Sequence, residues 1–181
     1  MKAIRVAMKG VAPLLMHQYP MTPIEGLDKM TPEEQAEYSA YRDPDRDGEL
    51  YIPGVNVQRA LINAAAYSKG KGRASLQRVA AASIFVSPMR LGLGTRVYEI
   101  DSRPVVIAAT KGRVMRHRPM LKDGWEISFT LEYDEVLLSE KQVRQIVDDM
   151  GSRVGLLDFR PEKKGAFGRC MVTGWEPVNS R

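Results

Sequence analysis

The residues best suited to chemistry in this chain are cations that lie beside glycines and stacking side chains. The first group is Asn56 and Arg59 at the start of a predicted helix, followed by Lys69, Lys71 and Arg73. A helix N-terminus presents unpaired N–H groups and a positive dipole, so this group could bind a phosphate. An ordinary helix start with exposed basic residues would explain it equally well.

A second group lies in a segment that alternates like a β-strand. It consists of Arg113, Arg116, His117 and Arg118. Alternation predicts that Arg116 and Arg118 share one exposed face of the strand, with Met115 and His117 on the other. Cations and stacking groups on a protruding ribbon suit the phosphates and bases of a single nucleic-acid strand. An isolated hairpin has little core of its own, which favours a binding role for these residues.

A third group occupies a glycine-bearing loop predicted over residues 151–168. It comprises Arg160, Lys163, Lys164 and Phe167, with Arg169 directly after the loop. Backbone amides, cations and an aromatic ring could meet one nucleotide there. The order of residues does not match a Walker phosphate loop. A plain turn between a helix and a strand would also explain the glycines.

Positive charge is concentrated in the middle of the chain. The net charge is +5, but residues 51–122 hold thirteen Lys and Arg against only Glu99 and Asp101, whereas residues 20–50 hold three basic and nine acidic residues. Such a concentration is typical of polyanion binding, because neutralised phosphates release counterions. A solvated basic face without a partner is the alternative.

Candidates for catalysis or metal binding are few. The chain has two histidines, His17 and His117, and neither belongs to a catalytic motif. A lone histidine is more often structural than catalytic. The single cysteine, Cys170, excludes an intramolecular disulfide and a multi-cysteine metal site. The sequence therefore predicts no metal, no cofactor and, on balance, no enzyme. With no signal peptide or membrane span visible, we expect a cytoplasmic protein that does not enter a membrane.

The elements that position these groups follow a split β-α-β pattern. Alternation predicts strands at 3–9, 125–133 and 169–175, and helical spacing predicts helices at 55–68 and 139–150, with a helical or mixed stretch at 74–82 before the apolar residues 84–86. Ser139 and Gln142 match a capping box at the second core helix. This order predicts a single α+β domain over residues 1–181 with a ferredoxin-like (RRM-like) antiparallel sheet and two core helices.

Two further segments add to this core. Residues 20–50 are acidic and rich in proline, which predicts a surface insertion with a short helix at 31–41. Residues 103–121 predict a basic hairpin, with arms at 104–107 and 114–121.

Two short motifs resemble those of a known family. One is the lead into the first helix, Ile52-Pro-Gly-Val-Asn56 with Arg59 after it, and the other is the loop Gly165-Ala-Phe-Gly-Arg169. Together with the order of elements, they resemble the RAMP superfamily of CRISPR-associated RNA-binding proteins, and within it the backbone subunit of effector complexes. The resemblance implies that residues 53–59 hold guide-RNA phosphates and that the hairpin at 103–121 acts as a thumb. It also implies that copies line up along one RNA, with a target strand and other effector subunits as further partners. The chain is short for that subunit, so a solitary or minimal version fits as well.

Three functions stay open on the sequence. The first is non-catalytic binding of a single strand, for which the residues themselves do not distinguish RNA from DNA. The second is metal-independent RNA cleavage. Some RAMP relatives cleave RNA with a histidine, and others with an aspartate in a loop after the first strand. In this chain, His17 and Asp28 are the residues that allow such a comparison. The third is a protein-interaction or inhibitor module that uses the acidic residues 20–50.

Overall fold

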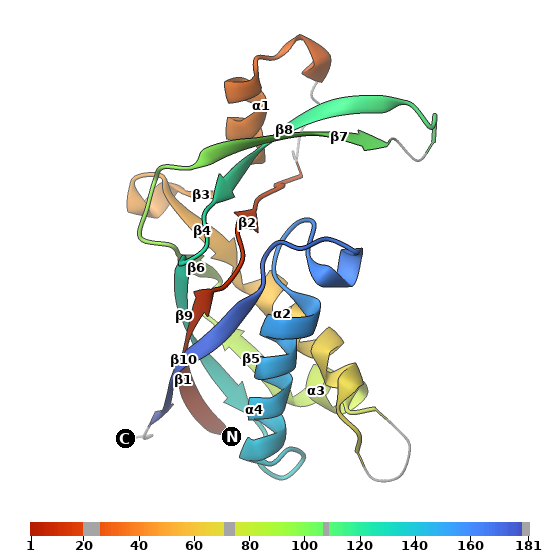
Figure 1. The fold of residues 1–181 in the computed structure, drawn as a ribbon. Coiled ribbons are helices and arrows are strands. Elements are labelled where there is room, and N and C mark those ends of the chain that lie inside the picture. The colour runs from red at the N-terminus through yellow and green to blue at the C-terminus, as the bar shows by residue number, and fades with distance from the viewer. Residues whose placement is uncertain (20–25, 71–74, 107–108, 179–181) are drawn as a thin grey trace.

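The chain is an α+β structure built around a four-stranded antiparallel sheet (Figure 1). The computed structural model describes residues 1–19, 26–70, 75–106 and 109–178. The strands of this main sheet, in the order β10-β1-β9-β5, are β1 (Lys2–Gly10), β5 (Ile84–Ser87), β9 (Glu126–Tyr133) and β10 (Cys170–Val178). Two helices, α2 (Gly54–Ala64) and α4 (Glu140–Asp149), cover one face of it.

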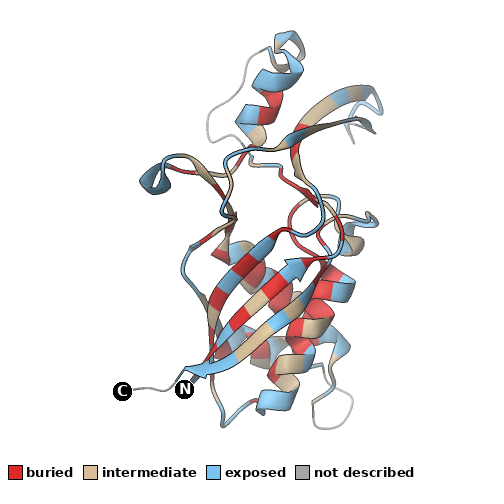
Figure 2. Ribbon diagram, turned by 60° about the vertical axis from the view of Figure 1, so that its left-hand side comes forward, coloured by how far each residue is buried: buried red, intermediate tan, exposed pale blue. Residues whose placement is uncertain are grey.

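Alternating apolar residues determine which face of the main sheet is buried. Across β1 and β9, Ile4 pairs with Leu131, Val6 with Phe129 and Met8 with Ile127. All six side chains are buried in one hydrophobic core, and Figure 2 shows buried and more exposed residues alternating along these strands. The predicted strands at 3–9 and 125–133 are confirmed, because a period of two fits a sheet with one covered face.

The helix α4 begins and packs as its sequence predicts. The Ser139 side chain accepts a hydrogen bond from the Gln142 backbone at 3.3 Å, and the Gln142 side chain accepts one from the Ser139 backbone at 2.9 Å. Val143, Ile146 and Val147 are buried in the core that also contains the apolar residues of β9. This face of the helix therefore packs on the sheet.

The helical conformation continues beyond α4 as a π-helical turn, Met150–Val154. The sequence predicts a loop from residue 151 onward, and the structure corrects this boundary. Gly151 allows the continuation, since a Cβ at this position would collide with the carbonyl group of Cys170 in β10. The chain can therefore remain helical while its backbone passes directly against the sheet.

The first core helix is shorter than predicted. The helix α2 ends at Ala64 and is followed by a 3-10 turn, Ala65–Tyr67, and then by α3 (Gln77–Ser83), which leads into β5. Ala74, predicted at the start of that stretch, lies outside the described residues. No helix within the described ranges is both long and apolar enough to cross a membrane.

Two small sheets and α1 (Pro32–Ser39) lie at one end of the main sheet. One contains β2 (Leu14–Leu15), β8 (Arg113–Leu121) and β7 (Glu99–Val106) in that order, and the other contains β3 (Arg42–Asp43), β4 (Glu49–Pro53) and β6 (Arg90–Gly92). The antiparallel hairpin β7–β8 extends away from the main sheet, and α1 packs against it (Figure 1). The pattern of residues does not predict β2, β3, β4 or β6.

Most acidic residues of the segment 20–50 are used in ion pairs. Glu37 pairs with Arg42, Asp43 and Asp45 with Arg90, Asp47 with Arg96, and Glu49 with Arg46. Five of the seven acidic side chains described in this segment are therefore paired, and two of their partners, Arg90 and Arg96, belong to the basic central block. The acidic segment thus neutralises part of the positive charge that the sequence concentrates there.

Candidate nucleic-acid interface

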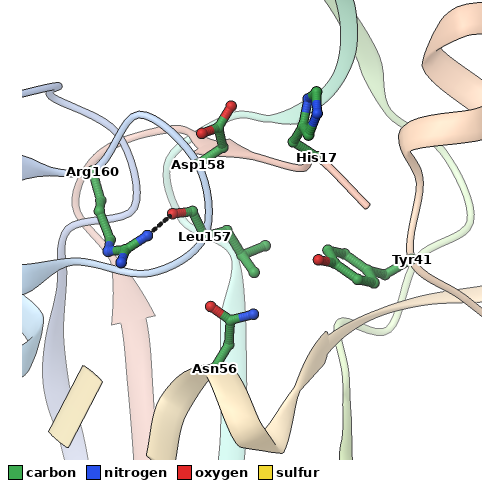
Figure 3. Close-up of a pocket in the computed structure, with 6 residues that line it drawn as sticks. All are labelled: His17, Tyr41, Asn56, Leu157, Asp158 and Arg160. Atoms are coloured by element: carbon green, nitrogen blue, oxygen red, sulfur yellow. Dashed lines mark hydrogen bonds between the residues drawn. The ribbon is translucent and has the colours of Figure 1, made fainter. Parts of the chain in front are cut away.

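A small pocket lies where four separate segments meet below the hairpin (Figure 3). Its volume is about 180 Å³, and it is lined by His17, Tyr41, Asn56, Leu157, Asp158 and Arg160. His17 follows β2, Tyr41 precedes β3, Asn56 lies in the first turn of α2, and the remaining three residues follow the π-helical turn. The described residues contain no group of three or more His, Cys, Asp or Glu placed to hold a metal ion.

Asp158 is held between β2 and β8. Its backbone N–H donates to the Leu15 carbonyl at 3.0 Å, and its carboxylate forms an ion pair with Arg118. Arg118 is only 6% exposed, and its Nε has no partner among the described residues. The expectation that Arg118 lies with Arg116 on an exposed ribbon is therefore wrong, because the base of β8 is covered by the loop that carries Asp158.

The backbone around Asp158 is strained. Leu157 and Phe159, on either side of it, have φ angles of 59° and 49°, in the left-handed region that bulky residues rarely adopt. Such conformations persist only where the surroundings enforce them, and they cluster at functional sites. The bridge between Leu15 and Asp158 provides that constraint on one side of the loop.

Arg160 and Asn56 form the opposite wall. Arg160 donates to the Leu157 carbonyl at 2.8 Å and to the Glu162 carboxylate at 2.7 and 3.0 Å. Glu162 also accepts a hydrogen bond from Asn63 of α2 at 2.7 Å, which fixes the loop to the helix. The Arg160 charge is therefore compensated, and the Asn56 amide points into the pocket (Figure 3).

His17 and Tyr41 complete the lining. Desolvation lowers the pKa of His17 below its ordinary value of 6.5, Arg118 and Arg116 act in the same direction, and Asp158 opposes them. The imidazole is therefore neutral at pH 7. The Tyr41 ring packs edge-on against Tyr51 with centroids 5.7 Å apart. Burial raises the pKa of the Tyr41 hydroxyl, which stays protonated.

Phe167 is part of an aromatic cluster at the base of the hairpin. The Arg103 guanidinium lies 4.8 Å from the Phe167 ring centroid and 5.2 Å from that of Phe159, and it is also held by Asp101 through two hydrogen bonds of 2.6 Å. The two rings are 5.8 Å apart. Phe167 thus stacks within the protein and links β7 to the loop, and Arg103 is a structural residue that the sequence analysis did not single out.

The glycines of the loop before β10 are required by close packing. A Cβ on Gly165 would collide with the Phe159 backbone, and one on Gly168, whose φ is 71°, would collide with the Leu156 backbone. The plain turn that the sequence left open is therefore sufficient to explain these two glycines.

Many of the predicted cations lie outside the pocket and have no acidic partner among the residues that the structure describes. No ion pair with a described residue is formed by Arg59, Lys69, Arg113, Arg116, Lys163, Lys164 or Arg169. Lys69 follows the far end of α2 and Arg113 lies toward the tip of the hairpin, so neither is near the pocket. Lys71 and Arg73 lie outside the described residues, as does the Asp28 side chain.

His117 belongs to the other face of the hairpin. Its Nδ1 lies 2.7 Å from the Ser102 hydroxyl on the neighbouring strand. The structure therefore separates His117 from Arg116, as alternation predicts.

Tyr41 and Asp158 were missed in the sequence analysis. Asp158 carries a weak signal, since it is an acidic residue within the predicted basic loop. Tyr41 carries none, because its place in the pocket depends on contacts between distant segments.

A second hollow, of about 380 Å³, lies beside β6 and β9. Its two arginines, Arg46 and Arg90, are both paired with carboxylates. It therefore offers less uncompensated charge than the region around the first pocket.

Comparisons with known proteins concern the fold alone. No family model and no curated relative matches the chain. Its structure is similar to a chain in the type III-B Cmr-beta complex bound to cognate target RNA, with a TM-score of 0.60 and 12% identity over 98% of this chain and 61% of the other. A chain of a type IV-B CRISPR complex gives a TM-score of 0.51 and 11% identity over 95% and 90%. This chain thus spans about three fifths of the first neighbour, and its fold is that of subunits in CRISPR effector complexes.

Proposed function

We propose that this protein is a non-catalytic, cytoplasmic subunit that binds single-stranded RNA, as a RAMP-type backbone subunit of a CRISPR effector complex does. Copies of it would assemble side by side along one guide strand, next to a target strand and other subunits. The similarity of fold to chains of two CRISPR complexes supports this proposal.

The arrangement of the main sheet supports a ferredoxin-like core. Its elements follow one another as β1, α2, β5, β9, α4 and β10, and the strand order is β10-β1-β9-β5. Two helices on one face of a four-stranded antiparallel sheet match the split β-α-β arrangement of that fold. The hairpin β7–β8 would then be the thumb.

One observation carries the functional proposal. Cations that form no ion pair with a described residue lie on three elements near the pocket: Arg59 on α2, Arg116 on the hairpin, and Lys163 and Lys164 on the loop before β10. In a folded protein, uncompensated cations on three converging elements favour a polyanion that follows a path between them.

The protein is expected to retain single-stranded RNA in a gel-shift or anisotropy assay, with an affinity that falls as salt rises. Each phosphate contact contributes about 0.7 to the slope of log affinity against log salt, so four contacts predict a slope near −3. Arg116→Glu is expected to weaken binding by about tenfold and to reduce this slope, because it removes one contact and adds repulsion.

Lys141→Glu provides a matched control, since Lys141 is exposed on α4 at the end far from the hairpin. It makes the same change in net charge and is expected to leave RNA affinity almost unchanged. Equal losses in the two variants, or an affinity that does not respond to salt, would contradict the proposed interface.

A metal-independent ribonuclease is the second candidate, and the neutral His17 beside Asp158 favours it. A neutral imidazole can accept a proton from a ribose hydroxyl, and its lowered pKa would keep it active in mildly acidic solution. If the protein cleaves RNA, His17→Ala is expected to abolish cleavage while RNA retention persists. The assay is incubation with labelled RNA in EDTA, and intact RNA after prolonged incubation with the wild-type protein would exclude this candidate.

A protein-interaction module based on the acidic segment is less well supported. Five of its carboxylates are already paired with arginines of the same chain. Of the acidic side chains that the structure describes in this segment, only Glu33 and Glu34 in the first turn of α1 are left without an ion pair.

A further inference from the structure

We propose that the pocket of about 180 Å³ recognises the 2′-hydroxyl of one ribose and thereby selects RNA over DNA. This inference rests on the proposed function, because it presupposes that the protein binds a single strand. It goes further by assigning the selectivity for RNA over DNA to a defined pocket. The basic residues alone cannot provide this selectivity, because both strands carry the same phosphates.

The charges around the pocket disfavour a phosphate inside it. Asp158 is paired with Arg118, Arg160 is paired with Glu162, and His17 is neutral at pH 7. The lining therefore offers no uncompensated cation, and the Asp158 carboxylate would repel an anion. Phosphates would bind more favourably to Arg59, Arg116 and Lys164, which lie outside the pocket and pair with no acidic residue in the described part of the chain.

The groups that point inward suit a neutral hydrogen-bonding partner. The Tyr41 hydroxyl and the Asn56 amide point into the pocket from opposite segments (Figure 3). Neither side chain makes a hydrogen bond with a described residue. A phenol donates and accepts, as an amide does, and a ribose 2′-hydroxyl can satisfy both because it is itself a donor and an acceptor.

The pocket is small compared with sites that enclose a drug-sized ligand. Those sites are about 300–1,000 Å³, whereas this one has about 180 Å³. Tyr41 presents its hydroxyl to the cavity, while its ring is held against Tyr51. Tyr41 can therefore form a hydrogen bond with the ligand more readily than its ring can stack on a base. This favours a sugar over a base as the occupant of the pocket.

The test compares three strands of one sequence and length: RNA, DNA and 2′-O-methyl RNA. The wild-type protein is expected to bind RNA three- to tenfold more tightly than either of the others, the range that one or two net hydrogen bonds provide. Tyr41→Phe and Asn56→Ala are expected to lower the affinity for RNA to that for DNA and to leave DNA binding unchanged. Tyr51→Phe is the matched control, since Tyr51 contacts the Tyr41 ring but does not line the pocket. It should retain the preference for RNA.

The outcomes separate this inference from the proposed function. Equal binding of RNA and DNA by the wild-type protein, or equal losses for both strands in Tyr41→Phe, would overturn the inference and leave the proposed function in place. A preference for RNA that disappears on an abasic ribose strand would identify a base as the occupant and also overturn it. Failure to retain any strand would overturn the proposed function, and the inference with it. Tyr41→Phe removes one oxygen, so thermal melting should show that it remains folded.

Discussion

Arg118→Ala is expected to lower the free energy of unfolding by about 3 kcal/mol, the lower end of the range for breaking a buried ion pair. The Arg118 side chain is 7% exposed and is paired with Asp158, whose side chain is 36% exposed. Removing the Arg118 side chain leaves the Asp158 carboxylate without its ion-pair partner in a partly desolvated environment. It also leaves a cavity where the aliphatic part of the arginine packs. The measurement is urea unfolding monitored by tryptophan fluorescence.

Arg116→Ala is the matched control two residues away on the same strand. Arg116 has no ion pair with a described residue and is only partly buried. We expect its effect on the unfolding free energy to stay within about 0.5 kcal/mol, as for most surface substitutions, while RNA affinity falls. Similar losses of stability in the two variants would show that the ion pair with Asp158 does not hold the loop in place.

A double-mutant cycle then tests whether Asp158 is the partner that matters. Combining Arg118→Ala with Asp158→Ala should destabilise less than the sum of the single changes, because the orphaned carboxylate is gone. Additive losses would assign the stability to packing of the arginine stem.

Strong local periodicity made the core of the fold predictable. In β1 and β9 the apolar residues alternate, and in α4 they recur at helical spacing behind a capping box. The small strands β2 and β3 have two residues each and β6 has three, too short for any period to appear. Their pairing depends on contacts between segments far apart in the chain, which a single sequence does not reveal.

The site was predicted less well for the same reason. Alternation correctly placed Arg116 and Arg118 on one face of β8, but only the docking of the loop at Asp158 distinguishes the buried residue from its neighbour. The distribution of charge along the sequence also overstated the number of cations that are free to bind a ligand. Of the eleven Lys and Arg in residues 51–122 that the structure describes, five form ion pairs: Arg90, Arg96, Arg103, Arg118 and Lys122.

Ile146→Ala is expected to cost about 2–5 kcal/mol of unfolding free energy through lost burial and the cavity that remains. Ile146 is fully buried in the core formed by α4 and the main sheet, away from the pocket and the hairpin. At temperatures where the variant is folded, its RNA affinity should equal that of the wild-type protein. Denaturant unfolding and RNA retention, measured on the same preparation, check the two expectations together.

Gln145→Ala is the control for this helix, because Gln145 is the exposed residue directly before Ile146. It should change neither stability nor binding, since it removes no buried contact from a helix that tolerates alanine well. Loss of RNA retention in a fully stable Ile146→Ala variant would contradict the arrangement proposed here. Binding would then depend on the face of α4 that packs on the sheet, and the interface between α2 and the hairpin could not be the principal site.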